Sequence, residues 1–384
     1  MTHKRHSIFP SDRPARRARP SAGQIGFCLM SSFCFILVLR NSDAAITYMG
    51  QGLTLCARTV IPSLFPFMVI SELLVSSGAG EALGRLFSRA MRWLFGLSGA
   101  GASAVFLGSM CGFPVGARTA VGLLDRNAIS KSECEHLLTF TNNPSSAFLI
   151  TTVGASLYGS RHLGVVLYGT VLGCGLLVGF LAKFFLHRSR EPEEHPHFPS
   201  GLHIGGVETF TSAVSNAATG MLTVCAYVVF FSALTGALGC AVGDTGRIGD
   251  MGYTLLSGAM EMTSGISLAS SLSDREWGII LTAAFAGWSG ISVHCQVMTL
   301  CAGRGLSFKP YILAKTAQGL LCGAVMAAIL LLRPQWIRVS NDAVMDAILA
   351  FTALKDISIP ALLTDGIFMM GWVISRTRSW RKNA

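Results

Sequence analysis

The stretch FLGSMCGFPVGARTA, residues 106–120, decides the fold of this chain. It is apolar at both ends, but Gly112, Pro114 and Gly116 interrupt its centre. A helix needs about 20 apolar residues to cross roughly 30 Å of hydrocarbon, so neither half can cross alone. Because lipid cannot satisfy free backbone groups, the stretch predicts a helical hairpin that enters and leaves the membrane on one side. The stretch LLSGAMEMTSGISLA, residues 255–269, has a polar centre and predicts a second such hairpin.

The composition places both hairpins in a membrane protein. The 384 residues are 51% hydrophobic and only 13% charged, against about 25% charged in an ordinary soluble domain. Apolar blocks lie near residues 25–39, 60–77, 138–154, 162–186, 217–240, 277–300, 310–332 and 359–374. We therefore predict an all-α polytopic membrane protein with about eight transmembrane helices and two re-entrant hairpins, within about 99–124 and 251–272.

Composition and motifs disfavour several other classes of protein. The net charge of +10 comes from Lys and Arg clustered at the ends of apolar blocks, which disfavours nucleic-acid binding. The 11 Cys form no CxxC pair and have no His at zinc spacing, so no metal site is expected. The sequence contains no Walker A, HExxH, GxSxG or dinucleotide GxGxxG motif, so neither an enzyme nor a bound cofactor is expected.

The chain divides into two similar halves at a Pro-, Glu- and His-rich stretch, residues 187–203. The predicted repeats, 44–186 and 204–333, each contain a span, a hairpin, a span with a broken centre and a final span. The last three elements keep an offset of about 143 to 149 residues. Each repeat has an odd number of full crossings, so the second begins on the opposite face of the membrane. The sequence thus predicts an inverted-topology repeat, the architecture of many secondary transporters.

The segments outside the repeats set the topology. We predict a basic cytoplasmic tail at 1–24, a first transmembrane helix at 25–39 and a cytoplasmic linker at 187–203. Residues 340–384 are expected to form an amphipathic segment, a last transmembrane helix and a basic tail. With both termini in the cytoplasm, about 20 Lys and Arg lie inside and about 8 outside, as the positive-inside rule requires. The expected location is a bacterial cell membrane.

Four interruptions of the helices are expected to meet near the bilayer midplane, where discontinuous helices bind solutes in folds of this kind. Asn143 as N-cap with Pro144 at the first helical position would start one half-helix there, and Ser289 with Gly290 would break another. Half-helix N-termini favour anions and polar oxygens, so we expect a small anionic or strongly polar solute. The predicted solute-binding residues are Arg118, Asn142, Asn143, Ser289, Gly112, Gly116, Thr263 and Ser264.

Two further residues are candidates for ion or proton coupling. Glu261 is central to the second hairpin, and His294 follows the second break by about one turn; ionisable residues inside membranes often carry such roles. Structural roles stay open as alternatives. Arg118 could pair with Glu261 and hold the hairpins together, the two Asn could join helices, and His294 could simply pack. The pairs Gly169/Gly173, Gly175/Gly179 and Gly319/Gly323 are expected at close helix contacts without a solute role.

The motifs also resemble a known family. GFPVGARTA (112–120), ISKSECEHLLTFTNNPSSAFLITTVG (129–154) and EMTSGI (261–266) are similar to the YlbJ-like sporulation integral membrane proteins, within the nucleoside-recognition (Gate) domain proteins. The resemblance covers about residues 50–335. It implies two Gate-like repeats and a role in endospore formation, with the forespore membrane as one candidate location. It also implies dipicolinate, a small aromatic dicarboxylate, as cargo.

Three functions follow as hypotheses. The first is a transporter of a small anionic or polar solute, with lipid and solute as its partners and a homo-oligomer left open. Gate domains are similar to the hairpin core of concentrative nucleoside transporters, so a nucleoside-type cargo is the second. The third is a gate or scaffold subunit of a membrane complex needed for spore formation, which would move no solute itself.

Overall fold

The computed structural model describes residues 22–76, 79–186, 206–242 and 246–332, and this part of the chain is helical without a strand. The first half contains α1 (Ala22–Arg40), α2 (Ser42–Leu55), η1 (Cys56–Val60), α3 (Ile61–Ser76), α4 (Ala79–Phe95), η2 (Gly99–Gly101), α5 (Ala102–Cys111), α6 (Val115–Asp125), α7 (Lys131–Thr141), η3 (Phe148–Leu157) and α8 (Arg161–Leu186). The second half contains α9 (Val207–Val242), α10 (Gly246–Met260), α11 (Met262–Ser270), α12 (Arg275–Trp288), α13 (Gly290–Cys301) and α14 (Lys309–Leu332). The predicted all-α class is confirmed.

The helices have the length and surface of membrane spans. Four described spans are long and apolar enough to cross a bilayer, namely α8, α9, α12 with α13, and α14; the number is up to six if the bent pairs α1–α2 and α4–α5 each count as one. Apolar side chains are exposed on their outer faces, as for Leu222 (72%), Leu320 (73%) and Leu331 (81%), which suits contact with lipid. The predicted linker at 187–203 and the last helix at 359–374 lie outside the described residues.

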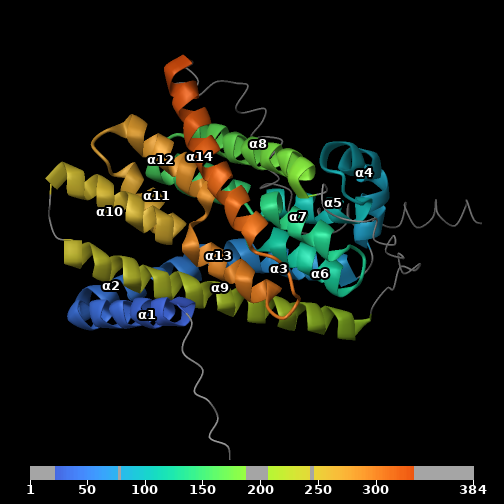
Figure 1. Ribbon diagram of the computed structural model, residues 1–384, viewed down its shortest axis with the longest axis horizontal. Helices are drawn as coiled ribbons and strands as arrows, with labels where there is room; N and C mark the ends of the chain where they lie inside the picture. Colours follow the sequence, from blue (N-terminus) through green and yellow to red (C-terminus); the bar gives the residue numbers. More distant parts are fainter. Residues whose placement is uncertain (1–21, 77–78, 187–205, 243–245, 333–384) are drawn as a thin grey trace, which may run out of the picture.

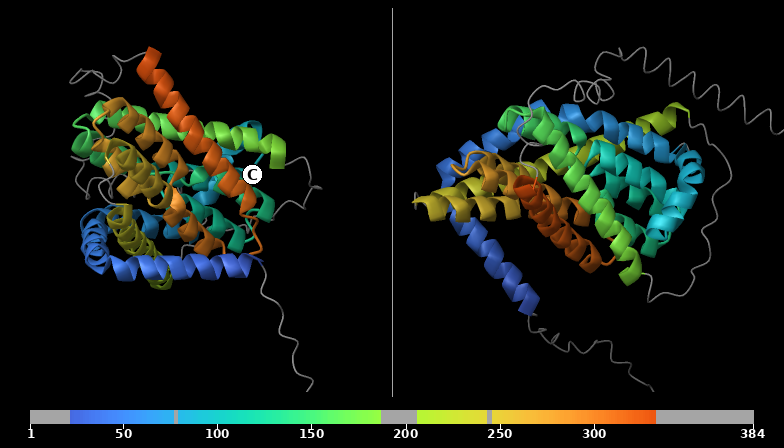
Figure 2. Two further views of the ribbon diagram at one scale, coloured as in Figure 1. Left: turned by 60° about the vertical axis from the view of Figure 1, so that its left-hand side comes forward. Right: turned by 90° about the horizontal axis from the view of Figure 1, so that it is seen from above.

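Long helices frame one side of the molecule. The apolar block expected at 60–77 is the end of a longer helical run that begins at Ser42 and passes through the π-helical turn η1. This run lies along α9, as Figure 1 shows at the lower edge of the view. A Cβ on Gly52 would lie 3.0 Å from Ser232 Oγ, so a glycine is needed for the close approach of α2 and α9. Helix α1 lies at the periphery of the bundle in all views (Figure 2).

The two halves repeat the same order of elements after these long helices. Hairpin α5–α6 corresponds to α10–α11, the broken helix α7–η3 to α12–α13, and α8 to α14. The corresponding helices begin at 115 and 262, at 131 and 275, and at 161 and 309, in agreement with the predicted offset. Figure 1 shows the two hairpins at opposite ends of the molecule, with α13 between them. This opposed placement is what an inverted-topology repeat requires.

Glycines set the contacts between several of these helices. A Cβ on Gly179 would lie 2.5 Å from the Phe140 ring, and one on Gly319 would lie 3.0 Å from Trp288 Cβ. The predicted close contacts at 175/179 and 319/323 are thus confirmed. The prediction is wrong for 169/173, because these two glycines are exposed on α8 with nothing within 4 Å of a Cβ.

Candidate functional site

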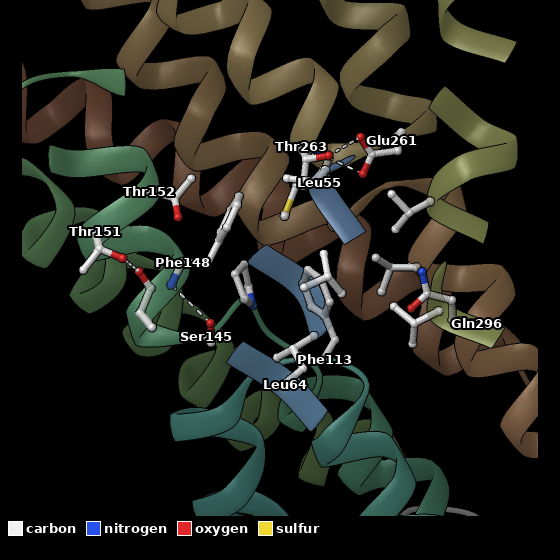
Figure 3. Close-up of a pocket in the computed structure, with 17 residues that line it drawn as sticks. Leu55, Leu64, Phe113, Ser145, Phe148, Thr151, Thr152, Glu261, Thr263 and Gln296 are labelled. Atoms are coloured by element: carbon white, nitrogen blue, oxygen red, sulfur yellow. Dashed lines mark hydrogen bonds between the residues drawn. The ribbon is translucent and has the colours of Figure 1, made fainter. Parts of the chain in front are cut away.

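The interrupted elements meet at one cavity of about 140 Å³, which we call the tip pocket. Its walls come from the tips of both hairpins, from the first helix break, from α13, and from the long helices α2–α3 and α9 (Figure 3). Most of the lining is apolar, and the polar lining residues include Ser145, Thr152, Glu261 and Gln296. Three of the four interruptions expected to meet therefore border this cavity, and the second break, at Ser289 and Gly290, does not line it.

The tip of the first hairpin is pressed against the first break. Helix α5 ends at Cys111, and its C-cap Gly112 has a φ of +83°, which belongs to the left-handed region that favours glycine. A Cβ on Gly112 would lie 2.5 Å from the Ser145 backbone nitrogen. Phe113 then projects into the tip pocket. Gly116 lies instead at a helix contact, where an added Cβ would collide with the Thr141 carbonyl, and it does not line the pocket.

The first break differs in detail from the prediction. Helix α7 ends at Thr141, and residues 142–145 are not helical. The predicted N-cap Asn143 is wrong, because Ser145 Oγ accepts the hydrogen bond from the Phe148 nitrogen at 3.2 Å. Pro144 disfavours the helical conformation for the residue before it. The side-chain amide of Asn143 forms hydrogen bonds with α14 instead of capping the half-helix. The half-helix that follows is π-helical, a form often found at functional sites.

A buried lysine from the second half binds the first break. Lys315 in α14 is 0% exposed, and its Nζ donates to the Asn142 carbonyl at 3.0 Å. It also donates to Gln318 Oε1 at 2.8 Å and to Asn143 Oδ1 at 3.4 Å. Asn142 Nδ2 donates to the Tyr311 hydroxyl at 3.4 Å. Both predicted Asn thus join helices and do not line the tip pocket.

Glu261 is the N-cap residue of α11, the returning half-helix of the second hairpin. Its carboxylate accepts from the Thr263 nitrogen at 3.0 Å, from Thr263 Oγ1 at 2.5 Å and from the Ser264 nitrogen at 2.7 Å (Figure 3). These bonds satisfy two of the free N–H groups at the start of α11. Glu261 and Thr263 line the tip pocket, and Glu261 is the one charged side chain among the described lining residues.

The second break is a single residue. Ser289 adopts a left-handed conformation with φ of +76° between α12 and α13, and its buried Oγ has no hydrogen-bond partner among the described residues. Gly290 allows this break to pack against the second tip, since an added Cβ would lie 2.9 Å from the Met262 nitrogen. His294 does not reach the pocket: its Nδ1 bonds the Tyr311 hydroxyl at 2.9 Å.

Arg118 lies in a second cavity of about 260 Å³, which we call the Arg118 cavity. Its Nε donates to Glu72 at 2.5 Å and its guanidinium also donates to the Asn216 carbonyl at 2.6 Å. The alternative pairing of Arg118 with Glu261 is wrong, because α3 and not the second hairpin faces α6 here. The two cavities share Val224 and Gln296 as walls, so they adjoin.

Two important residues were missed from the sequence. Gln296 lines both cavities, is 3% exposed, and has a buried Oε1 without a partner in the described structure. Lys315 binds the first break. A signal for Lys315 was present, since a lysine and Gln318 lie three residues apart in the middle of an apolar block, where polar residues are costly. Gln296 gave no comparable signal.

Comparisons with known proteins agree with this architecture. Residues 57–185 match the Gate family, described as nucleoside recognition. Over 350 residues the chain is 27% identical to the sporulation integral membrane protein YlbJ of Bacillus subtilis strain 168, with 81% of this chain and 84% of that protein covered. No solved structure matches the chain. The resemblance stated from the sequence is confirmed: this is an integral membrane protein whose first half matches the Gate family model, and it is similar to YlbJ over most of its length.

Proposed function

We propose that this protein moves a small polar solute across the membrane and binds it in the tip pocket. The observation that supports this proposal is that both hairpin tips and the first break border one cavity. Opposed hairpins and broken helices place backbone groups at the membrane midplane, where solutes bind in transporters built from repeats. A movement of either tip would open the pocket toward one face of the membrane.

The lining of the tip pocket suits a flat solute with polar edges. Phe113 and Phe148 provide aromatic walls against which a ring can stack. Glu261 and the unpartnered Oε1 of Gln296 can accept hydrogen bonds. The N-terminal turn that follows Ser145 presents backbone N–H groups, which favour oxygens of the solute.

Dipicolinate is the cargo that we favour, and we propose a role for the chain in sporulation, in a membrane around the forespore. The similar protein YlbJ is described as a sporulation protein, and dipicolinate has the ring and the polar edges that the pocket suits. Arg118 supports passage of an anion, since it lies in the adjoining cavity with a side chain that is 14% exposed. The Arg118–Glu72 pair keeps donors near the path without adding net charge.

A nucleoside-type solute is the second candidate, and a separate observation favours it. The charged group in the described lining of the tip pocket is an acid, Glu261, which would repel a dicarboxylate but could accept hydrogen bonds from a sugar or base. The Gate family description names nucleoside recognition. The two cargo classes therefore differ in the sign of the charge that the pocket prefers.

The test is uptake and binding in proteoliposomes that contain the full-length protein. Dipicolinate, a nucleoside and a simple dicarboxylate are offered with and without a proton or sodium gradient. We expect uptake of one class above protein-free liposomes. Gln296→Leu should reduce it about tenfold or more, because a buried polar contact is worth about 1–3 kcal/mol. Thr316→Val, on the exposed face of α14, is the matched control and should not change uptake.

The opposite result has a clear meaning. If folded protein neither binds nor moves any of the three classes, the transport proposal fails. The remaining function is then that of a gate or scaffold subunit for a membrane complex. If uptake occurs but Gln296→Leu leaves it unchanged, the solute does not bind in the tip pocket.

A further inference from the structure

The strongest feature outside the tip pocket is the buried lysine at the first helix break. Lys315 is fully buried in the first third of α14. The ion pairs of the described residues join Arg118 to Glu72 and Arg304 to Asp125, so Lys315 has no carboxylate partner in that part of the chain. A charged group buried within a membrane protein is costly and usually marks a function.

Three oxygen atoms surround the amino group of Lys315. They are the backbone oxygen of Asn142, set free by the break, and the side-chain oxygens of Asn143 and Gln318, at 3.0, 3.4 and 2.8 Å. A lysine ammonium has three donors and no acceptor. The three acceptors therefore match the ammonium form.

The orientation of both amides is fixed by backbone carbonyls. Asn143 Nδ2 donates to the Phe140 carbonyl at 2.7 Å, and Gln318 Nε2 donates to the Val171 carbonyl at 3.0 Å. Carbonyl groups only accept hydrogen bonds, so the nitrogen of each amide must face them. The oxygen of each amide must then face Lys315. The Asn143 oxygen also accepts from Gln318 Nε2 at 2.8 Å, so the two amides are joined to each other as well as to the amino group of Lys315.

We propose that the ammonium of Lys315 is a built-in cation that occupies a monovalent cation site at the first break. A free carbonyl of an interrupted helix together with amide oxygens is the kind of ligand set that holds Na⁺ in transporters. Here the side chain of α14 supplies the positive charge, so the site takes no Na⁺ from solution. If the proposed function is right, and on that condition only, solute movement does not require a Na⁺ gradient.

The experiment measures the stability of the purified full-length protein and needs no solute. Melting temperatures are compared in NaCl and in choline chloride at equal ionic strength. The wild type should melt at the same temperature in both. Lys315→Ala removes the ammonium and leaves the three oxygens, so this variant should melt lower in choline chloride, and NaCl should restore at least half of the loss. Lys309→Ala, at the exposed start of the same helix, is the matched control and should show no response to Na⁺.

A second variant keeps the proposal testable if Lys315→Ala alone does not fold. Lys315→Ala combined with Asn143→Asp places a carboxylate in the site and should increase the response to Na⁺ further. The proposal is overturned if Na⁺ specifically stabilises the wild type, or if Na⁺ and choline act equally on both variants. It is also overturned if neither variant is recovered folded in NaCl. Because the readout is a melting temperature, these outcomes do not depend on whether the protein transports a solute.

Discussion

The two helix breaks have corresponding places in the chain but different chemistry. The first break leaves four residues without helical structure, and a lysine from the other half of the protein binds its free carbonyl. The second break is one non-helical residue, Ser289, followed by Gly290, and both have a left-handed φ. The Ser289 nitrogen still donates to the Phe285 carbonyl at 2.7 Å. Its hydroxyl group has no partner in the described structure. The first break is held by charge and the second by backbone geometry.

The hairpin tips show the reverse distribution of charge. The second tip carries Glu261, which caps its own half-helix, whereas α6 in the first hairpin begins at Val115 and its N-cap residue, Pro114, makes no side-chain cap. The positive charge thus binds the break of the first half, and the negative charge lies in the tip of the second. The two halves share the same order of elements, but the charged side chains at corresponding places differ. Four sets of variants test this comparison.

The largest effect is expected at the first break. Lys315→Met leaves two buried oxygens, the Asn142 carbonyl and Gln318 Oε1, without their donor. We expect it to lower the free energy of unfolding by about 3–5 kcal/mol, as for other broken buried charge networks. Unfolding in mixed detergent micelles, followed by circular dichroism, measures this loss. Lys309→Met at the exposed start of α14 should cost less than about 0.5 kcal/mol. A loss below about 1 kcal/mol for Lys315→Met would show that charge does not hold the first break.

The next effect concerns the contact that each half makes between tip and break. Gly112→Ala and Gly290→Ala each force a Cβ into a left-handed residue, and the new atom would lie 2.5 Å and 2.9 Å from a backbone nitrogen. We expect a loss of stability of about 2–3 kcal/mol for each, larger for Gly112→Ala. Gly169→Ala, where a Cβ meets nothing within 4 Å, is the control and should be nearly neutral. Equal tolerance of all three would mean that the tips do not touch the breaks.

A smaller effect is expected at the two caps. Glu261→Gln weakens a charged cap and should cost about 1–2 kcal/mol. Ser145→Ala removes the neutral cap of the first break and should cost about 1 kcal/mol. The same unfolding measurement ranks the two. The reverse order would contradict the view that the negative charge at the second tip stabilises its half-helix.

The smallest effect is expected at the second break and has the opposite sign. Ser289→Gly should raise the free energy of unfolding by about 0.5–1 kcal/mol, because glycine adopts a φ of +76° without strain. It loses no hydrogen bond, since the Ser289 hydroxyl has none in the described structure. A clear loss of uptake by a variant that is no less stable would instead show that this hydroxyl contacts the solute, and a clear loss of stability would contradict the prediction.

The elements of the site were easier to predict than its contacts. The Gly- and Pro-rich centre at 112–116 and the polar centre at 261–265 located both tips correctly. The Asn143–Pro144 pair suggested the wrong cap, because a side chain of α14 competes for the Asn143 amide. Arg118 was expected beside the solute, but its partner Glu72 lies 46 residues away in α3. No spacing in the sequence encodes such a pair.

The sequence by itself determined the all-α membrane class, the two hairpins, the breaks and the repeated order of elements. It could do so because lipid leaves backbone groups no partner outside the helix, so every interruption of an apolar block must have structural meaning. Only the tertiary structure decided which charges meet, which cavity each polar group lines, and that Lys315 binds the first break. Those contacts join residues far apart in the chain, 46 positions for Arg118 and Glu72 and 173 for Asn142 and Lys315, and they depend on how the helices pack.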